Sequence, residues 1–294
     1  MHPSAHAQAH PHKPAIIMAG SGQVVTYDQL DRRSNQGAHL FRSLGLKAGD
    51  CVALFMDNSA TYFEIAWAAQ RSGLYYACVS SKLTAGEVAY ILKDSRAQAL
   101  IASPGLAEIG REAAAEAGVR LFSADGAFDG AEAFEAARAA MPETPIADES
   151  AGADMLYSSG TTGRPKGVKV ALTGAPIDAD NSLRMLTSAL YGLDGSAIYL
   201  SPAPLYHAAP LRWCMTLQKM GATTVIMEKF DPETFLKLIG THKVTASQMV
   251  PTMFVRLLKL PEDVRRRYDV SSLKAVIHAA APCPIPIKEQ MIAW

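Results

Sequence analysis

Short apolar runs alternate with amphipathic segments along most of the chain from Thr26 onward. Most of these runs are apolar on both faces, which is typical of parallel strands that helices cover on each side. The pattern therefore predicts a layered α/β protein with largely parallel sheets. Strands are expected at residues 51–55, 75–79, 98–102, 119–122, 154–157, 167–172, 197–200, 223–227 and 244–249, with a further strand-like run at 273–277.

Explicit start and stop signals bound the amphipathic segments. Thr84 with Glu87 fits a capping box, in which two side chains satisfy N–H groups at the start of a helix. Asp231 before Pro232 places an N-cap ahead of a proline in the first turn. Helices are expected near 26–45, near 59–72 and after Asp231, whereas residues 126–150 are expected to form a surface helix and a connecting loop.

The size and charge of the chain limit what it can be. With 294 residues, 49% of them hydrophobic, it can bury a large core and is expected to form about two globular units. Lys and Arg total 28, as do Asp and Glu, so no overall basic field attracts nucleic acid, which is not expected as a partner. No apolar segment reaches membrane-spanning length and no secretion signal opens the chain, so a cytoplasmic location is the default expectation.

Neither the cysteines nor the N-terminal histidines predict a metal site. The cysteines are widely scattered without a Cys-x-x-Cys pair, which argues against zinc and disulfides and favours small buried hydrophobes. The histidines lie among Ala, Gln and Pro at the start of the chain, where a solvated tail is expected. These residues are Cys51, Cys78, Cys214 and Cys283, and His2, His6, His10 and His12.

The run at 157–168, Tyr-Ser-Ser-Gly-Thr-Thr-Gly-Arg-Pro-Lys-Gly-Val, has the chemistry of a polyphosphate-binding loop. Its glycines let main-chain N–H groups approach an anion, its hydroxyls donate hydrogen bonds, and Lys166 supplies a mobile positive charge. It is not a Walker loop, because Pro165 stands where the second glycine would be and Gly167 follows the lysine. The predicted phosphate-binding residues are Ser158, Ser159, Gly160, Thr161, Thr162, Gly163, Lys166 and Gly167.

Two further segments occur in a definite order after this loop. Residues 204–210 read Pro-Leu-Tyr-His-Ala-Ala-Pro, and residues 279–282 read Ala-Ala-Ala-Pro after the strand-like run at 273–277. Together with the loop, they resemble the motifs of the adenylate-forming superfamily, which contains acyl-CoA synthetases, peptide-synthetase adenylation domains and luciferases. Because order and separation also fit, the resemblance covers essentially the whole chain.

The resemblance implies a fold and a reaction. The fold is the αβαβα N-terminal region of this superfamily, with one subdomain at about 10–55 plus 194–294 and a similar one at about 56–193, which carries the loop 157–168. The reaction is the ATP-dependent adenylation of a carboxylic acid, fatty or otherwise largely apolar, followed by thioester formation with CoA. The implied partners are thus small molecules, the acid, ATP and CoA, and a homo-oligomer is left open.

The resemblance also implies roles for individual residues. Lys166 and His207 would act in catalysis, and the backbone of Ala279, Ala280, Ala281 and Pro282 would lie along the adenine, although the family more often has a glycine pair there. Tyr206, His207, Ala208 and Ala209 would lie near the acid, with Leu211 and Trp213 either further pocket walls or ordinary core. Mg²⁺ is expected with ATP, but no metal ligand is assigned.

The end of the chain carries a further expectation. Residues 286–294 predict a helix without a Gly, Asn or Pro stop signal. The chain is therefore expected to be cut within the N-terminal region, without the mobile C-terminal domain that carries the family's adenylation lysine, and to be incomplete for catalysis. A non-catalytic nucleotide-binding fragment and an adenylation domain for another class of acid remain alternatives.

Overall fold

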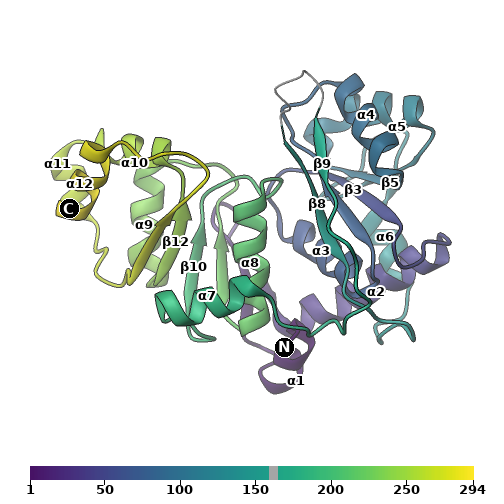
Figure 1. The fold of residues 1–294 in the computed structure, drawn as a ribbon, viewed down its shortest axis with the longest axis horizontal. Coiled ribbons are helices and arrows are strands. Elements are labelled where there is room, and N and C mark those ends of the chain that lie inside the picture. The colour runs from purple at the N-terminus through teal and green to yellow at the C-terminus, as the bar shows by residue number, and fades with distance from the viewer. Residues whose placement is uncertain (159–164) are drawn as a thin grey trace. The chain divides into compact units, whose positions relative to one another are not determined.

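The computed structural model describes residues 1–158 and 165–294, and these form two compact units (Figure 1). Unit 1 comprises Met1–His12, Tyr27–Ala179 and Leu205–Ala208. Unit 2 comprises Lys13–Thr26, Asp180–Pro204 and Ala209–Trp294. Each unit is built around one sheet, so the predicted layered α/β fold with largely parallel sheets is confirmed.

The sheet of unit 1 has seven strands in the order β7-β6-β5-β3-β4-β8-β9. Neighbouring strands are parallel except for the antiparallel pair β8 and β9. The strands are β3 (Cys51–Phe55), β4 (Tyr75–Cys78), β5 (Ala97–Ala102), β6 (Arg120–Ser123), β7 (Glu132–Ala133), β8 (Ala153–Ser158) and β9 (Lys166–Val168). The helices are α1 (Pro3–Ala9), α2 (Tyr27–Ser43), α3 (Ala60–Arg71), α4 (Ala85–Ser95), α5 (Ala107–Ala117) and α6 (Phe134–Ala139), with a 3₁₀ turn, η1, at Pro104–Leu106.

Helices bury both faces of this sheet. On one face, α4 and α5 pack Val88, Ile91 and Ala113 against Ala53 and Phe55 of β3. On the other face, Phe122 of β6 meets Phe134 of α6 edge to face at 6.1 Å, and Phe134 contacts Phe41 of α2. The strands are therefore apolar on both sides, as the sequence pattern predicts.

The sheet of unit 2 has six strands in the order β13-β12-β10-β11-β1-β2, and neighbouring strands are parallel except for the antiparallel pair β1 and β2. Among the described residues, none of the helices is long and apolar enough to cross a membrane. The strands are β1 (Pro14–Met18), β2 (Val24–Thr26), β10 (Ile198–Ser201), β11 (Thr223–Ile226), β12 (Ala246–Met249) and β13 (Ala275–His278). The helices are α7 (Ser182–Tyr191), α8 (Ala208–Met220), α9 (Pro232–His242), α10 (Pro251–Leu258), α11 (Glu262–Arg267) and α12 (Ile285–Ala293).

The prediction that the N-terminal segment is a solvated tail is wrong, because the segment forms a helix that packs on unit 1. Residues 3–9 form α1, with His2 as its N-cap and Pro3 in the first turn. The His2 side chain is 1% exposed and lies edge to face against Trp67 of α3 at 5.1 Å. His6 contacts Tyr27 of α2. Burial of these rings stabilises a short helix that its own propensity does not sustain.

The start of the chain contributes to both units. Lys13–Thr26 belongs to unit 2, because β1 pairs in parallel with β11, Ile16 opposite Thr224. By contrast, α2 and β3 belong to unit 1, where β3 lies between β5 and β4.

The cysteines are all free, and burial makes three of them unreactive. Burial raises the pKa of Cys51 to about 11 and that of Cys214 to about 12, and Cys78 is also buried. Cys283 differs from the prediction of a buried residue, because it is only partly buried after β13.

Candidate functional site

The glycine-rich run is carried by the β8–β9 hairpin at the edge of the unit 1 sheet (Figure 1). Tyr157 lies opposite Gly167, and Ser158 lies opposite Lys166, which is exposed. Since β8 is parallel to β4, the run begins at the carboxyl end of a parallel strand, the edge where open α/β sheets bind ligands. The predicted residues Ser159, Gly160, Thr161, Thr162 and Gly163 lie outside the described residues.

Gly167 is explained by packing within this hairpin. A Cβ atom there would lie 2.8 Å from Cε of Met155 and 2.9 Å from Cζ of Tyr157. Real Cβ atoms do not come so close to other heavy atoms. Gly167 therefore makes room for two side chains of β8. This packing role is additional to the predicted role in phosphate binding.

Tyr206 and His207 lie on a short loop that a side chain of unit 1 holds in place. The backbone N–H of Leu205 donates a hydrogen bond to Oδ1 of Asn58 at 2.8 Å, and Asn58 lies just after β3. The rings of Tyr206 and His207 lie 4.5 Å apart. Because only β4 separates β3 from β8, the structure brings this loop and the β8–β9 hairpin to the same edge of one sheet.

The environment of His207 favours its neutral form. The side chain is exposed at the surface, yet partial desolvation of the ring lowers the pKa of His207 below its ordinary value. At neutral pH, the imidazole can therefore donate one hydrogen bond and accept another without carrying a charge.

The residues after His207 divide between surface and core. Ala208 and Ala209 are partly buried at the start of α8. Leu211 is fully buried, and the Trp213 ring stacks on Tyr199 of β10 at 6.3 Å with an interplanar angle of 11°. Leu211 and Trp213 are thus core residues of unit 2.

The segment Ala279–Pro282 follows the carboxyl end of β13 in unit 2. The N–H of Ala279 donates to the carbonyl of Met249, which extends the pairing of β13 with β12 by one residue. Ala280 then adopts a φ of 72°, the left-handed region that favours glycine. The residues from Ala280 to Pro282 are exposed. The segment predicted to lie along adenine thus contains a left-handed residue, with alanine where glycine fits best.

Replacing Ala280 by glycine is expected to stabilise the protein by about 0.5–1 kcal/mol, because removing the Cβ relieves left-handed strain that exceeds the added backbone entropy of glycine. Urea-induced unfolding followed by circular dichroism measures the change. Ala281→Gly is the matched control, since Ala281 is exposed and is not among the left-handed residues. Equal effects of the two substitutions would contradict the prediction.

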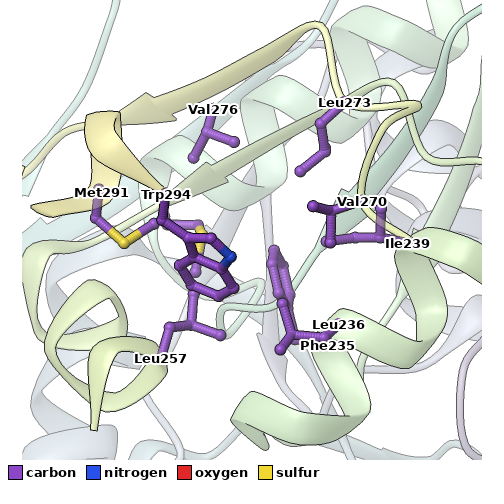
Figure 2. A pocket seen from close by; sticks show the side chains of 10 residues that line it. Phe235, Leu236, Ile239, Leu257, Val270, Leu273, Val276, Met291 and Trp294 are labelled. Atoms are coloured by element: carbon purple, nitrogen blue, oxygen red, sulfur yellow. The ribbon is translucent and has the colours of Figure 1, made fainter. Parts of the chain in front are cut away.

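A small apolar cavity lies elsewhere in unit 2, between α9, α10, β13 and α12 (Figure 2). Its volume is about 120 Å³, and its walls include Phe235, Leu257, Val276, Met291 and Trp294. No charged side chain lines it, so it does not suit a triphosphate or a carboxylate.

No magnesium ligand set is found in the part of the chain that the structure describes. There, no three His, Cys, Asp or Glu side chains are grouped so that they could hold a metal ion. We therefore assign no protein ligand to Mg²⁺.

The sequence analysis did not identify two residues whose side chains hydrogen-bond to the predicted site segments. Asn58 fixes the His207 loop, and Asp94 accepts a hydrogen bond from the Tyr157 hydroxyl. A signal existed for Asn58, because the polar run 57–59 stands between a predicted strand and a predicted helix start. No local pattern marks Asp94, which lies 63 residues from Tyr157.

Comparisons with known proteins agree on one family. Residues 4–294 match the family model described as AMP-binding enzyme. The chain is 31% identical over 276 residues to 4-coumarate–CoA ligase 1 of Petroselinum crispum, covering 92% of this chain and 50% of that protein. It is 30% identical over 308 residues to the fatty acid–[acyl-carrier-protein] ligase ScoC of Streptomyces coeruleorubidus, covering 99% of this chain and 54% of that protein.

The fold agrees with a solved structure as well. MatB from Rhodopseudomonas palustris, solved with ATP bound, superposes with a TM-score of 0.80 at 23% identity, over 100% of this chain and 58% of that one. The chain thus spans about half the length of the curated relatives it matches.

Proposed function

The chain belongs to the family of AMP-binding enzymes, and from this premise we propose that it is the nucleotide- and acyl-binding part of an acid–CoA ligase. Such an enzyme activates a carboxylic acid with ATP and passes the acyl group to CoA. The observation that carries the proposal is the β8–β9 hairpin, which places exposed Lys166 at the carboxyl edge of the unit 1 sheet, where the His207 loop also lies.

In the proposed reaction, a carboxylate oxygen attacks the α-phosphorus of ATP, and the bond to the departing pyrophosphate breaks. A thiol then attacks the acyl carbon and AMP leaves. We propose that Lys166, with the hydroxyl and N–H groups of residues 158–163, holds the β- and γ-phosphates and stabilises charge as pyrophosphate departs. Neutral His207 would donate a hydrogen bond to the entering carboxylate or to the α-phosphate.

The other predicted residues complete this assignment. We propose that the exposed turn Ala279–Pro282 contacts adenine through its backbone, and that Tyr206, Ala208 and Ala209 adjoin the acid. Mg²⁺ would neutralise phosphate charge, which is the chemistry it supplies whenever it binds ATP.

For the acid, we propose a fatty or otherwise largely apolar molecule. Residues 201–221 contain no Asp or Glu that could anchor a substrate amine, which disfavours an amino acid. The matched relatives differ in the acid that their names give, coumarate in one and a fatty acid in the other. Carboxylate-dependent exchange of pyrophosphate into ATP, compared for fatty, hydroxycinnamic and amino acids in the presence of Mg²⁺, tests the class.

Replacing Lys166 by alanine is expected to weaken ATP binding about tenfold, because a charge-assisted contact to phosphate is lost, and a tenfold change corresponds to about 1.4 kcal/mol. Isothermal titration calorimetry of ATP onto each protein measures the change. Lys169→Ala is the matched control just after β9, since the Nζ of Lys169 lies 4.4 Å from the centroid of the Tyr75 ring and is engaged there. Unchanged affinity in Lys166→Ala would refute the role of this lysine.

A second candidate is a module that binds the nucleotide without completing the reaction. Nucleotide binding without pyrophosphate exchange for any acid would support this candidate, whereas exchange by the chain itself would exclude it.

A further inference from the structure

The strand that bears Lys166 has few partners of its own. β9 contains three residues, all exposed, and lies at the edge of the sheet, where it pairs with β8. Short exposed edge strands with little buried apolar surface open locally at low cost. Other contacts must therefore fix the orientation of β9 and of Lys166.

Tyr157 supplies such a contact. Its hydroxyl donates a hydrogen bond to Oδ2 of Asp94 at 2.6 Å, the short distance of a hydrogen bond to an ionised acceptor. Asp94 lies in the last turn of α4, which contacts β9 (Figure 1). Burial and the bond to Asp94 raise the pKa of Tyr157 well above its ordinary value, so the phenol stays protonated as a donor.

The ring of Tyr157 reaches Asp94 by crossing the partner strand at Gly167. These two residues face one another in the β8–β9 register. A Cβ at Gly167 would lie 2.9 Å from Cζ and 3.0 Å from the hydroxyl oxygen of Tyr157. Any other side chain at this position would push the ring away from Asp94. The absence of a side chain at Gly167 and the bond to Asp94 are thus parts of one arrangement.

We propose that Tyr157, Gly167 and Asp94 form a latch that fastens the β8–β9 hairpin to α4 and so positions Lys166 for the triphosphate. Tyr157 and Asp94 are positioning residues that act through Lys166, the immediate neighbour of Gly167. The inference rests on the proposed function only in naming the triphosphate. The hydrogen bond from Tyr157 to Asp94 would hold the hairpin on α4 whatever the ligand is.

A second tyrosine holds the chain just after β9. The hydroxyl of Tyr75 donates to the carbonyl of Val170 at 2.6 Å, and Lys169 lies over the same ring. This contact involves none of the latch residues, so in latch variants the hairpin is expected to loosen around Lys166 without leaving the sheet. Global stability should therefore change little.

The test compares Tyr157→Phe, Asp94→Ala and the double variant with Tyr268→Phe. Tyr268 is the matched control, because its hydroxyl makes a similar bond to Glu233 at 2.7 Å, but in unit 2. Each latch variant is expected to weaken ATP binding about fivefold, and the double variant no further than either single one, because both substitutions remove one interaction. Asp94→Asn, which keeps an acceptor oxygen, should retain most of the affinity.

Exchange of the backbone amide hydrogens of residues 166–170 tests the latch without a nucleotide. Exchange in the latch variants is expected to be about tenfold faster than in the parent protein and in Tyr268→Phe, at similar thermal stability. If the parent protein binds ATP and the latch variants change neither affinity nor exchange, the latch is refuted. If the parent binds no ATP, the proposed function fails, and exchange alone decides: faster exchange supports the latch and unchanged exchange refutes it.

Discussion

Replacing Glu64 by alanine is expected to lower the free energy of unfolding by about 3–5 kcal/mol, because it breaks a buried ion-pair cluster and leaves arginine charge behind. Glu64, on α3, is 2% exposed. Its Oε1 accepts a bond from Arg33 of α2 at 2.7 Å, and its Oε2 pairs with Arg138 of α6. Arg138 is itself buried, so water cannot replace the lost carboxylate.

The measurement is urea-induced unfolding followed by circular dichroism. Glu116→Ala is the matched control, since Glu116 pairs with Lys93 at 2.9 Å but both side chains are about half exposed, and its cost should stay within about 0.5 kcal/mol. The double variant Glu64→Leu/Arg138→Leu should cost less than the sum of its single substitutions, because it removes both buried charges. A loss of stability no larger for Glu64→Ala than for Glu116→Ala would contradict the prediction.

This cluster shows the limit of the sequence analysis of the fold. Local signals predicted elements well: Thr84 and Glu87 form the expected capping box, and Asp231 accepts the N–H of Thr234 at 2.8 Å at the start of α9. Each expected strand has a counterpart within a few residues. By contrast, nothing local links Glu64 to Arg138, which lies 74 residues later. Ion pairs between helices depend on tertiary packing, which periodicity does not encode.

The strands β1, β2 and β7, which the sequence analysis did not predict, also depend on tertiary contacts. β2 and β7 contain three and two residues, too few to show a distinct pattern. The apolar run of β1 begins at Pro14, and a proline weakens the prediction of a strand. They exist because a neighbouring strand offers free backbone groups: β11 pairs with β1, and β6 pairs with β7. A short strand of this kind is specified by the sheet it joins.

The candidate site was predictable to a different extent. The residue types of the loop at 157–168 predict phosphate binding without reference to the fold, and this stays a prediction. The resemblance of the motifs then indicated the family, which the family model confirms. The sequence does not predict the hydrogen bonds that position these segments, from Leu205 to Asn58 and from Tyr157 to Asp94. These contacts join distant segments at one edge of a sheet.

Replacing Gly152 by alanine is expected to cost about 3 kcal/mol or more, because the new methyl group meets backbone atoms that no rotamer change can move. A Cβ there would lie 2.2 Å from the carbonyl oxygen of Leu74 and 2.8 Å from that of Ala69. The N–H of Gly152 also donates to the carbonyl of Gln70 at 2.6 Å, so the chain is held close to the end of α3.

The position of Gly152 connects this strain to the site. Ala153, the next residue, begins β8 opposite Tyr75 of β4, and β8 leads directly into the loop that carries Lys166. A shift large enough to relieve the overlap would move the start of β8 relative to β4. Gly152→Ala is therefore expected to weaken ATP binding as well as lower stability, in contrast to Glu64→Ala, whose cluster lies among helices α2, α3 and α6.

Unfolding in urea and ATP titration on the same samples measure both effects. Gly86→Ala is the matched control, since Gly86 lies in the first turn of α4 and a Cβ added there would meet nothing within 4 Å, so alanine should be neutral or stabilise by up to about 1 kcal/mol. If Gly152→Ala unfolds at the same urea concentration as the parent protein, the close approach of this backbone to Leu74 is not what fixes β8. If stability falls but ATP affinity stays unchanged, the start of β8 does not govern the position of Lys166.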